Sequence, residues 1–366
     1  MKIAFDAKRF FHNTSGLGNY SRDLVRILSK YYPENQYLLL NKNKSERGSD
    51  ILENSDVTFV ETSKGTMSRQ FKMGKDAQKE NADIFHGLSG ELPLQWDKKP
   101  IKKIVTIHDL IFVRYPQYYS FFDRKIHLWK FKKAANTADK IIAISEQTKR
   151  DIIQYLKVPE SKIEVIYQGC HQAFKEEQSD EFIQKTKEKF NLQERFILNV
   201  GTIEERKNLF SIVKAIKDTE IPLVVVGKKT KYYQKIANFI QKNKMEKQIH
   251  FLEKVSMDEL AAIYKLADIF IYPSFFEGFG IPVIEALFSK TVTITSNTSC
   301  LPEAGGPDSV YIDPKNYLDI QSKIKFLWDS ESERKRRSDK GLEFVQKFND
   351  EPIAYQLMSL YQKNIS

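Results

Sequence analysis

Cysteine is nearly absent from this sequence. Its 366 residues include only Cys170 and Cys300. Two isolated thiols cannot build a disulfide framework or a cysteine metal cluster. The first residues also lack a secretory signal, because Asp6, Lys8 and Arg9 end the apolar run that begins the chain. Both features predict a protein of the reducing cytoplasm.

Long hydrophobic runs are missing as well. No stretch of about 18 apolar residues occurs, so we expect no segment that crosses a bilayer. Hydrophobic residues still make up 41% of the chain and charged residues 29%, which is the composition of a folded globular protein. At about 150 residues per domain, the length predicts two domains, each able to bury its own core.

Negative charge is in deficit, since 58 lysines and arginines stand against 48 acidic residues. A net charge of +10 suits nucleic acid, an anionic membrane or an anionic substrate. The cations are dispersed and no nucleic-acid motif is present, so we expect no nucleic-acid partner. Denser stretches at 121–140 and 228–247 are typical of solvated helix faces. The first interleaves Phe121, Phe122 and Trp129 with cations, which also fits peripheral contact with the inner face of the cytoplasmic membrane.

Short β-branched runs alternate with helical stretches along the chain. Lys2–Phe5 is typical of a strand, and Gly18–Tyr31 of a helix with apolar residues at helical spacing. The same patterns predict a strand at Ile269–Tyr272 and helices at Thr148–Leu156, Met257–Leu266 and Ile281–Phe288. The rhythm restarts after a polar stretch, Gln172–Phe182, which we interpret as a linker. The fold class is therefore α/β, with two doubly wound domains at residues 1–172 and 173–345. Parallel sheets bind ligands at their carboxyl edges, so we expect these domains to face each other across a ligand-binding cleft.

The strongest chemical signal lies in Ser274–Leu287, where a strand leads through a glycine-punctuated loop into a helix. Gly278 and Gly280 allow close approach of a ligand to the backbone. Pro282 suits a first helical turn, where its missing N–H costs nothing. The amides near Phe279–Pro282 then form a helix N-terminus, which favours phosphate or another anion.

Two carboxylates flank this loop. Glu277 and Glu285 are eight residues apart, or about 12 Å along a helix. That separation is too long for a pair sharing one proton. It suits two groups that bind hydroxyls at opposite ends of an extended ligand. A capped helix with a surface glutamate is the alternative interpretation.

A second signal lies in Asn199–Leu209, another strand–loop–helix segment. Arg206 and Lys207 are adjacent in its loop, at the expected ligand edge. The arginine fork and the lysine point charge together suit a diphosphate. A solvated loop is the alternative.

The N-terminal half carries weaker signals. Gly16 and Gly18 predict a flexible loop able to close on a ligand. His108 ends an apolar strand, where it would bind a sugar hydroxyl, relay a proton or be structural. Asp109 would orient His108 or cap the next turn. His86 fits a structural role better.

Taken together, the motifs resemble the retaining glycosyltransferases of family 4, also known as glycosyl transferases group 1. The most specific motif is Glu277-x7-Glu285 within FEGFGIPVIEAL. Other matching segments follow in the family's order: SGLGNY (15–20), TIHDL (106–110), IAISEQTKRDI (142–152), VIYQGC (165–170), VGTIEERKN (200–208) and LPEAGG (301–306). The resemblance implies a GT-B fold of two Rossmann-like domains. It also implies that a C-terminal helix, residues 346–366, crosses back to the N-terminal domain.

This resemblance assigns roles to residues. The C-terminal domain would bind a nucleotide sugar and the N-terminal domain an acceptor. Glu277 would contact hydroxyls of the donor sugar and Glu285 the ribose. Arg206 and Lys207 would neutralise the donor diphosphate, an electrostatic contribution to catalysis. The remaining expected contacts are backbone amides of Gly278, Phe279, Gly280 and Ile281, the pocket residues Leu301 and Glu303, the loop glycines Gly16 and Gly18, and His108 near the sugar's C6 side.

Two positions depart from the family's pattern. Thr202 stands where many members have an arginine, and Arg206 is expected to carry that charge instead. Gln168-Gly169 replaces the usual Asn-Gly after the interdomain strand. The Asp-x-Asp motif of metal-dependent transferases is missing. We therefore expect no metal ion and no cofactor beyond the nucleotide sugar.

The motif combination most resembles bacterial mannosyltransferases of surface-polysaccharide synthesis. It implies a hexosyltransferase that uses GDP-mannose and a glycan or polyisoprenyl-linked acceptor. Transfer from a UDP-sugar of glucose, GlcNAc or galactose is the alternative. An epimerase of the same fold is a further alternative, for which UDP release without acceptor would be the sign.

Overall fold

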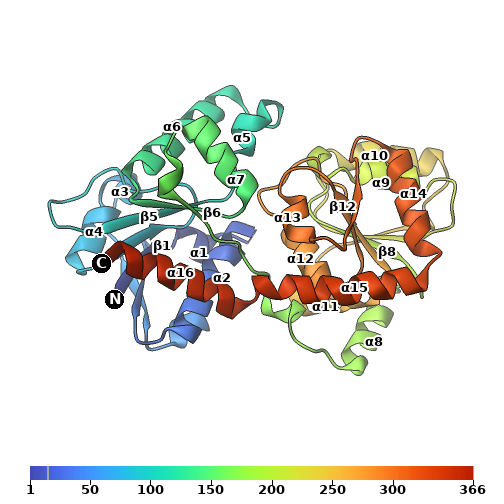
Figure 1. Cartoon of the computed structure of the whole chain (residues 1–366), viewed down its shortest axis with the longest axis horizontal. Helices are drawn as coiled ribbons and strands as arrows, with labels where there is room; N and C mark the ends of the chain where they lie inside the picture. Colours follow the sequence, from blue (N-terminus) through green and yellow to red (C-terminus); the bar gives the residue numbers. More distant parts are fainter. Residues whose placement is uncertain (15, 366) are drawn as a thin grey trace. The chain divides into compact units, whose positions relative to one another are not determined.

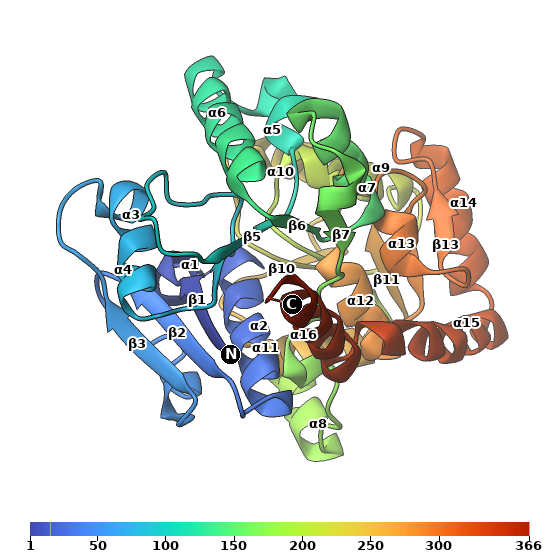
Figure 2. The ribbon, with the colours of Figure 1, turned by 60° about the vertical axis from the view of Figure 1, so that its left-hand side comes forward.

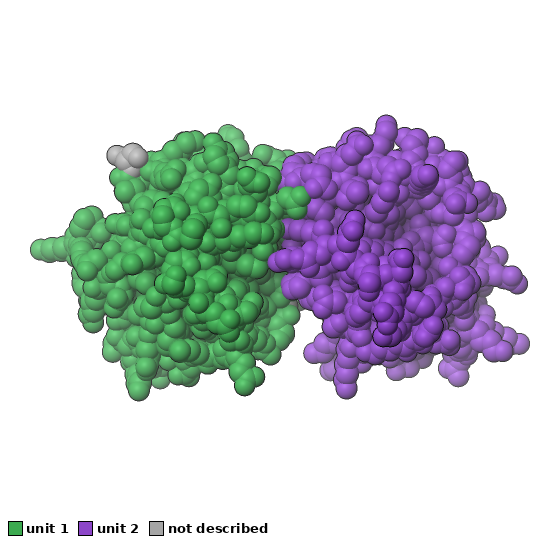
Figure 3. All heavy atoms as spheres, turned by 90° about the horizontal axis from the view of Figure 1, so that it is seen from below, with its two compact units in different colours: residues 1–169, 348–366 green, residues 170–347 purple. Residues whose placement is uncertain are grey.

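The structure is a computed structural model that describes residues 1–14 and 16–365. Ser15, the first residue of the SGLGNY segment, lies outside the described residues. The chain divides into two compact units, residues 1–169 with 348–366, and residues 170–347 (Figure 3). The stretch expected to be the linker, Gln172–Phe182, lies within the second unit and leads into a helix.

The first unit is built on a seven-stranded parallel sheet in the order β3-β2-β1-β4-β5-β6-β7 (Figure 1). Its strands are β1 (Lys2–Asp6), β2 (Gln36–Asn41), β3 (Val57–Glu61), β4 (Ile84–Gly87), β5 (Lys102–Ile107), β6 (Lys140–Ala143) and β7 (Ile163–Val165). Its helices are α1 (Lys8–His12), α2 (Gly16–Tyr31), α3 (Ser68–Phe71), α4 (Met73–Lys79), α5 (Ile111–Arg114), α6 (Phe121–Thr137), α7 (Glu146–Asp151) and α16 (Asp350–Ile365).

Both faces of this sheet are buried, as the near-continuous apolar strands predict. Side chains alternate along β1, so Ile3 and Phe5 join one core and Ala4 joins the other. The first core contains α2 and the C-terminal helix α16, whose Leu357 and Tyr361 are buried in it. Figure 2 shows α16 beside α2, far from it in sequence.

The second unit is built on a six-stranded parallel sheet in the order β10-β9-β8-β11-β12-β13. Its strands are β8 (Ile197–Val200), β9 (Leu223–Val226), β10 (Ile249–Leu252), β11 (Ile269–Tyr272), β12 (Thr293–Ser296) and β13 (Val310–Ile312). Its helices are α8 (Asp180–Lys189), α9 (Leu209–Ala215), α10 (Tyr233–Lys242), α11 (Met257–Leu266), α12 (Ile281–Phe288), α13 (Leu301–Gly305), α14 (Tyr317–Trp328) and α15 (Glu331–Val345).

Strand order reverses at one place in each sheet. In the first, the chain runs outward from β1 through β2 and β3 and then returns to β4 on the other side of β1. In the second, it runs from β8 through β9 and β10 and returns to β11 beside β8. Loops leaving the carboxyl ends of two such strands diverge and leave a crevice for a ligand. The loops that follow β8 and β11 carry the motifs singled out in the sequence.

The glycines of the N-terminal half do not form the flexible loop that we predicted. Both Gly16 and Gly18 lie in the first turn of α2, which begins two residues earlier than expected. The Gly18 N–H donates to Asn13 Oδ1 at 3.2 Å, and a Cβ on Gly18 would lie 2.0 Å from the Asn13 carbonyl oxygen. Close packing against Asn13 therefore explains the second glycine.

Membrane-spanning helices were not expected. Among residues 1–14 and 16–365, no helix has both the length and the apolar content that crossing a membrane requires.

Candidate active site

The loop after β8 brings two cations to the carboxyl edge of the second sheet. Gly201 turns the chain with φ +141°, and a 3-10 turn at Glu205–Lys207 follows. Asn208 then adopts φ +59° and donates through Nδ2 to the carbonyls of Pro273 and Pro314, at 3.1 and 2.7 Å. These bonds tie the β8 loop to the loops after β11 and β13.

The Glu277 carboxylate lies against both cations. Lys207 Nζ is 2.6 Å from Glu277 Oε1, and Arg206 Nη1 is 2.8 Å from Oε2. Ser274 Oγ and the Tyr272 hydroxyl also donate to Oε1, at 2.6 and 2.9 Å. Four donors therefore hold one carboxylate that is only 8% exposed. We call these five residues, Arg206, Lys207, Tyr272, Ser274 and Glu277, the carboxylate clamp.

Opposing effects set the charge of the clamp. Burial alone would raise the pKa of Glu277, but Lys207 and Arg206 outweigh it and hold the pKa at about 2. Burial lowers the pKa of the Lys207 ammonium, while Glu277 opposes that shift. Burial likewise opposes the charge of Arg206, but Glu277 and its neighbours raise the guanidinium pKa overall. The two ion pairs, at 2.6 and 2.8 Å, join the Glu277 carboxylate to both basic side chains.

A turn that requires glycine separates the clamp from the next helix. Gly280 has φ +107° and precedes α12, and a Cβ there would lie 2.9 Å from Leu301 Cδ2. The Phe279 ring is buried in the core. The first backbone N–H groups of α12, near Ile281, have no partner within the helix and point toward the loop. The N–H groups at a helix N-terminus favour an anion, and anion binding by this one stays a prediction.

Glu285 lies one turn into α12, in different surroundings. It is 9% exposed, and its Oε2 accepts a hydrogen bond from the Tyr264 hydroxyl at 3.1 Å. Burial raises the pKa of Glu285 to about 7, because Tyr264 and Lys207 offset only part of the desolvation. An added pair of hydroxyl donors, such as those of a ribose, would stabilise the ionised carboxylate.

His108 follows β5 at the carboxyl edge of the first sheet. Its Nε2 lies 2.9 Å from the Leu88 carbonyl oxygen, and its ring meets Tyr20 edge-on at 4.6 Å. Since a carbonyl only accepts, Nε2 carries the proton and Nδ1 is left as an acceptor. Burial lowers the pKa of His108 to about 4, so the ring is neutral and weakly basic. This geometry suits Nδ1 to accept a hydrogen bond from a hydroxyl group better than to relay a proton. Asp109 caps the next turn, accepting from the Ile111 N–H at 3.0 Å.

His86 lies deeper in the same unit, within a buried hydrogen-bonded chain. Its ring nitrogens lie 2.7 Å from the Tyr361 hydroxyl and 2.8 Å from Thr106 Oγ1, which is 3.1 Å from the Tyr20 hydroxyl. Burial lowers the pKa of His86 to about 3, so it is neutral. The chain links helix α16 to the tyrosine that contacts His108, in keeping with the structural role expected of His86.

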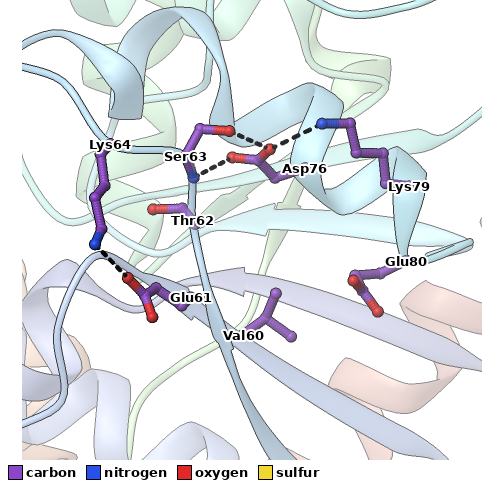
Figure 4. Close-up of a pocket in the computed structure, with 8 residues that line it drawn as sticks. All are labelled: Val60, Glu61, Thr62, Ser63, Lys64, Asp76, Lys79 and Glu80. Atoms are coloured by element: carbon purple, nitrogen blue, oxygen red, sulfur yellow. Dashed lines mark hydrogen bonds and ion pairs between the residues drawn. The ribbon is translucent and has the colours of Figure 1, made fainter.

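A separate pocket of about 410 Å³ lies at β3, at the edge of the first sheet (Figure 4). Two ion pairs line it. Lys64 lies 3.7 Å from Glu61, and Lys79 lies 3.7 Å from Asp76, which also accepts from the N–H and hydroxyl of Ser63 at 3.0 and 2.8 Å. Strands β2 and β1 lie between β3 and β4, so the pocket is remote from the reversal of strand order, and we assign it no role in the site.

Some residues of the site were missed by the sequence reasoning. Tyr272 and Ser274 hold Glu277, and Tyr264 holds Glu285. A polar residue at the carboxyl end of a strand, as Tyr272 is, could have been recognised. Tyr264 lies 21 residues before Glu285 on another helix, so no local pattern indicates it. Thr202, at the position where many family members have an arginine, is exposed, whereas Arg206 contacts Glu277 within the clamp.

Binding of a metal ion would require several side chains of the described residues to act together. Among residues 1–14 and 16–365, no group of three or more histidine, cysteine, aspartate or glutamate side chains is placed to hold a metal ion.

Comparison with known proteins identifies the family. Residues 180–344 match the family described as "Glycosyl transferases group 1", and residues 49–173 match "Glycosyltransferase Family 4". The chain belongs to glycosyltransferase family 4. The family 4 assignment covers both units and agrees with the resemblance seen in the sequence.

Relatives of this family 4 chain include mannosyltransferases. It is 29% identical over 252 residues to the serotype-specific mannosyltransferase WbdA of Escherichia coli, a match covering 64% of this chain but 30% of WbdA. It is 30% identical over 223 residues to the O-antigen chain mannosyltransferase RfbU of Salmonella typhimurium, covering 60% of this chain and 59% of RfbU. The chain thus spans about a third of the length of the first of these relatives.

Solved structures confirm the predicted GT-B fold. HepE of Anabaena, in complex with UDP and glucose, superimposes with a TM-score of 0.78 at 14% identity. The match covers 99% of this chain and 100% of HepE. The two parallel Rossmann-like sheets of this chain are those of the GT-B fold.

Proposed function

We propose that the protein is a retaining hexosyltransferase that moves mannose from GDP-mannose to a glycan or lipid-linked oligosaccharide acceptor, in the synthesis of a bacterial surface polysaccharide. The observation that carries this proposal is the carboxylate clamp. Two cations converge on one buried carboxylate beside a helix N-terminus, at the point where strand order reverses.

The clamp supplies what transfer from a nucleotide sugar requires. Negative charge develops on the diphosphate as the glycosidic bond breaks, and fixed cations stabilise it. Arg206 and Lys207 fill that role, with the amides of Gly278, Phe279, Gly280 and Ile281 beside them. Glu277 orients the sugar through its hydroxyls, and Glu285 binds the ribose eight residues further on. Leu301, packed against Gly280, shapes the nucleotide pocket.

The acceptor side belongs to the first unit. Gly16 and Gly18, at the start of α2, and the neutral ring of His108 lie at the carboxyl edge of its sheet. Nδ1 of His108 accepts a hydrogen bond from a sugar hydroxyl in this proposal. The choice of mannose is supported by the relatives WbdA and RfbU, both mannosyltransferases by name. HepE, crystallised with UDP and glucose, supports the UDP-sugar alternative.

A thermal-shift screen tests the proposal. GDP, UDP, ADP and their common sugar conjugates are added with and without EDTA, because a ligand that binds the native state raises the melting temperature. We expect GDP and GDP-mannose to raise the melting temperature, and we expect each shift to be the same with EDTA as without it. A shift confined to UDP compounds would overturn the sugar but keep the site. No shift with any nucleotide would overturn the proposed function.

A further inference from the structure

Helix α6 exposes apolar side chains that a globular protein ordinarily buries. Thirteen large hydrophobic residues are exposed in the described chain, and six of them fall between positions 118 and 129. Phe122 is 77% exposed, Phe121 57%, Trp129 56% and Ile126 54%. Together with Tyr118 and Tyr119, these residues form what we call the α6 patch. Contiguous apolar surface of this kind marks an interaction site.

The patch follows the outward face of the helix. Phe122, Ile126, Trp129 and Lys133 are spaced at i, i+4, i+7 and i+11 and form one stripe. The opposite face packs on the body of the unit through Leu128, Phe131 and the buried Ala134 and Ala135. The inward face already anchors α6, so folding of the unit does not require the outward aromatics.

Cations accompany the aromatic side chains. Residues 118–137 contain five lysines and arginines, which are Arg124, Lys125, Lys130, Lys132 and Lys133, and a single acid, Asp123. Lys130 lies 3.4 Å from Glu91, while Lys125, Lys132 and Lys133 are exposed. The Lys125 ammonium lies 4.7 Å from the centre of the Phe121 ring. The exposed face therefore combines aromatic rings with Lys125, Lys132 and Lys133 against Asp123, a net charge of +2 from three cations less one acid.

We propose that the α6 patch docks the protein onto an anionic lipid surface. Aromatic rings insert at the level of lipid headgroups, and nearby lysines are attracted to anionic lipids. A second copy of the chain is a poor occupant, because pairing the same patch would place two positively charged faces against each other. Nucleic acid is also a poor occupant, since the rings project from a convex helix rather than line a groove.

The position of the patch gives docking a purpose. Helix α6 lies between β5 and β6 along the chain of a parallel sheet, so its first residues lie toward the carboxyl edge, where His108 follows β5. Helix α5 and a 3-10 turn at Pro116–Tyr118 connect His108 to α6, and the ring centres of Phe112 in α5 and Phe131 in α6 are 5.2 Å apart. Docking through α6 would hold this edge near the headgroup of a lipid-linked acceptor. That purpose rests on the proposed function; the docking itself does not.

Vesicle co-sedimentation of the full chain tests docking. Vesicles of neutral phosphatidylcholine are compared with vesicles containing phosphatidylglycerol, at low and high salt. We expect binding to the anionic vesicles, weakened by salt because exposed charges are screened. The triple variant Phe121→Ser/Phe122→Ser/Trp129→Ser should lower the partition coefficient at least ~10-fold, since each ring contributes more than 1 kcal/mol of burial. Tyr355→Ser is the matched control, because Tyr355 is 65% exposed on α16 outside the patch.

Three results would overturn the docking proposal. They are no binding of wild type to anionic vesicles, equal binding by wild type and the triple variant, and a patch-dependent dimer or oligonucleotide complex without vesicle binding. Nucleotide binding in solution, measured on the triple variant, should match wild type. A failure of docking is thereby distinguished from a failure of the proposed donor site.

Discussion

Glu277 and Glu285 are buried to the same degree, at 8% and 9% exposed, yet their pKa values are shifted in opposite directions. Glu277 faces two cations and two hydroxyl donors, which hold its pKa at about 2. Glu285 has the Tyr264 hydroxyl as its nearest donor, and burial raises its pKa to about 7. Partners, and not depth, therefore decide the charge of a buried carboxylate.

This difference matters for ligand binding. In the clamp, Glu277 already occupies the cations that a diphosphate would use. Glu285 by contrast lacks donors that a ribose diol would supply. We infer that nucleotide binding changes the contacts of Glu277 with the two cations and supplies hydrogen-bond donors to Glu285.

Glu277→Gln removes the anion from the clamp. We expect the transfer rate to fall on the order of 100- to 1,000-fold, as when a group that stabilises or orients the transition state is lost. Nucleoside diphosphate affinity should be retained or should rise, because Arg206 and Lys207 lose their internal carboxylate. Turnover assays and calorimetry measure the two effects separately.

Glu204→Gln is the control for Glu277→Gln. Glu204 lies 2.7 Å from Arg206 Nη2, but its side chain is 40% exposed. A surface pair contributes about 0–1 kcal/mol, so activity should change less than ~5-fold. If Glu277→Gln weakened nucleotide binding and turnover by the same factor, the clamp would be a structural feature of the loop.

Glu285→Gln removes a carboxyl whose folded pKa is raised. That group contributes stability that is fully present below its unfolded pKa of 4.5 and is lost as pH rises to about 7. The glutamine variant does not titrate there. Between pH 4 and pH 8, wild type should therefore lose up to about 3 kcal/mol of unfolding free energy relative to the variant. Urea unfolding of both proteins across this range measures the difference, and parallel pH profiles would contradict the raised pKa.

Arg206→Lys keeps the charge of the clamp but removes the planar guanidinium group and its paired N–H donors. Lysine cannot bond two phosphate oxygens in parallel, so nucleoside diphosphate affinity should fall roughly 10-fold. Thr202→Arg in the same background restores an arginine where many family members have one. Calorimetry should then show partial recovery of affinity. Failure of the first variant to lose affinity would place the diphosphate elsewhere.

Tyr264→Phe removes the hydroxyl that donates to Glu285, at 3.1 Å, and leaves the clamp unchanged. Because this bond favours the charged carboxylate, its loss should raise the pKa of Glu285 by roughly half to one unit. The pH at which nucleotide affinity declines should rise by the same amount. An unchanged profile would mean that Glu285 does not titrate in binding.

Strand–loop–helix junctions were the part of the fold most readable from the sequence. The predicted bounds of α11, β11 and α12 agree with the structure, because Ser256 caps α11 and the Gly280–Pro282 turn fixes the start of α12. The helix predicted at Thr148–Leu156 instead begins at Glu146 and changes to a π-helical turn at Ile152–Leu156. Periodicity does not distinguish these two windings.

Local sequence patterns do not predict contacts between residues that are far apart in the sequence. Arg206, Lys207, Glu277 and Glu285 were singled out as separate ligand contacts. The pairing of Lys207 with Glu277, 70 residues apart, follows from the adjacency of β8 and β11, which local patterns do not reveal. The reach of Tyr361 to His86, 275 residues away, depends likewise on the packing of α16.

Calorimetric titration of GDP, with UDP as the second ligand, tests whether the carboxylate clamp binds the donor diphosphate. Wild type is compared with Lys207→Met and with Lys231→Met, a control for an exposed lysine outside the clamp. A charge-assisted bond contributes about 1.5–3 kcal/mol, so Lys207→Met should bind at least ~10-fold more weakly than the other two proteins. Equal affinity in all three proteins would contradict a donor site at the carboxylate clamp.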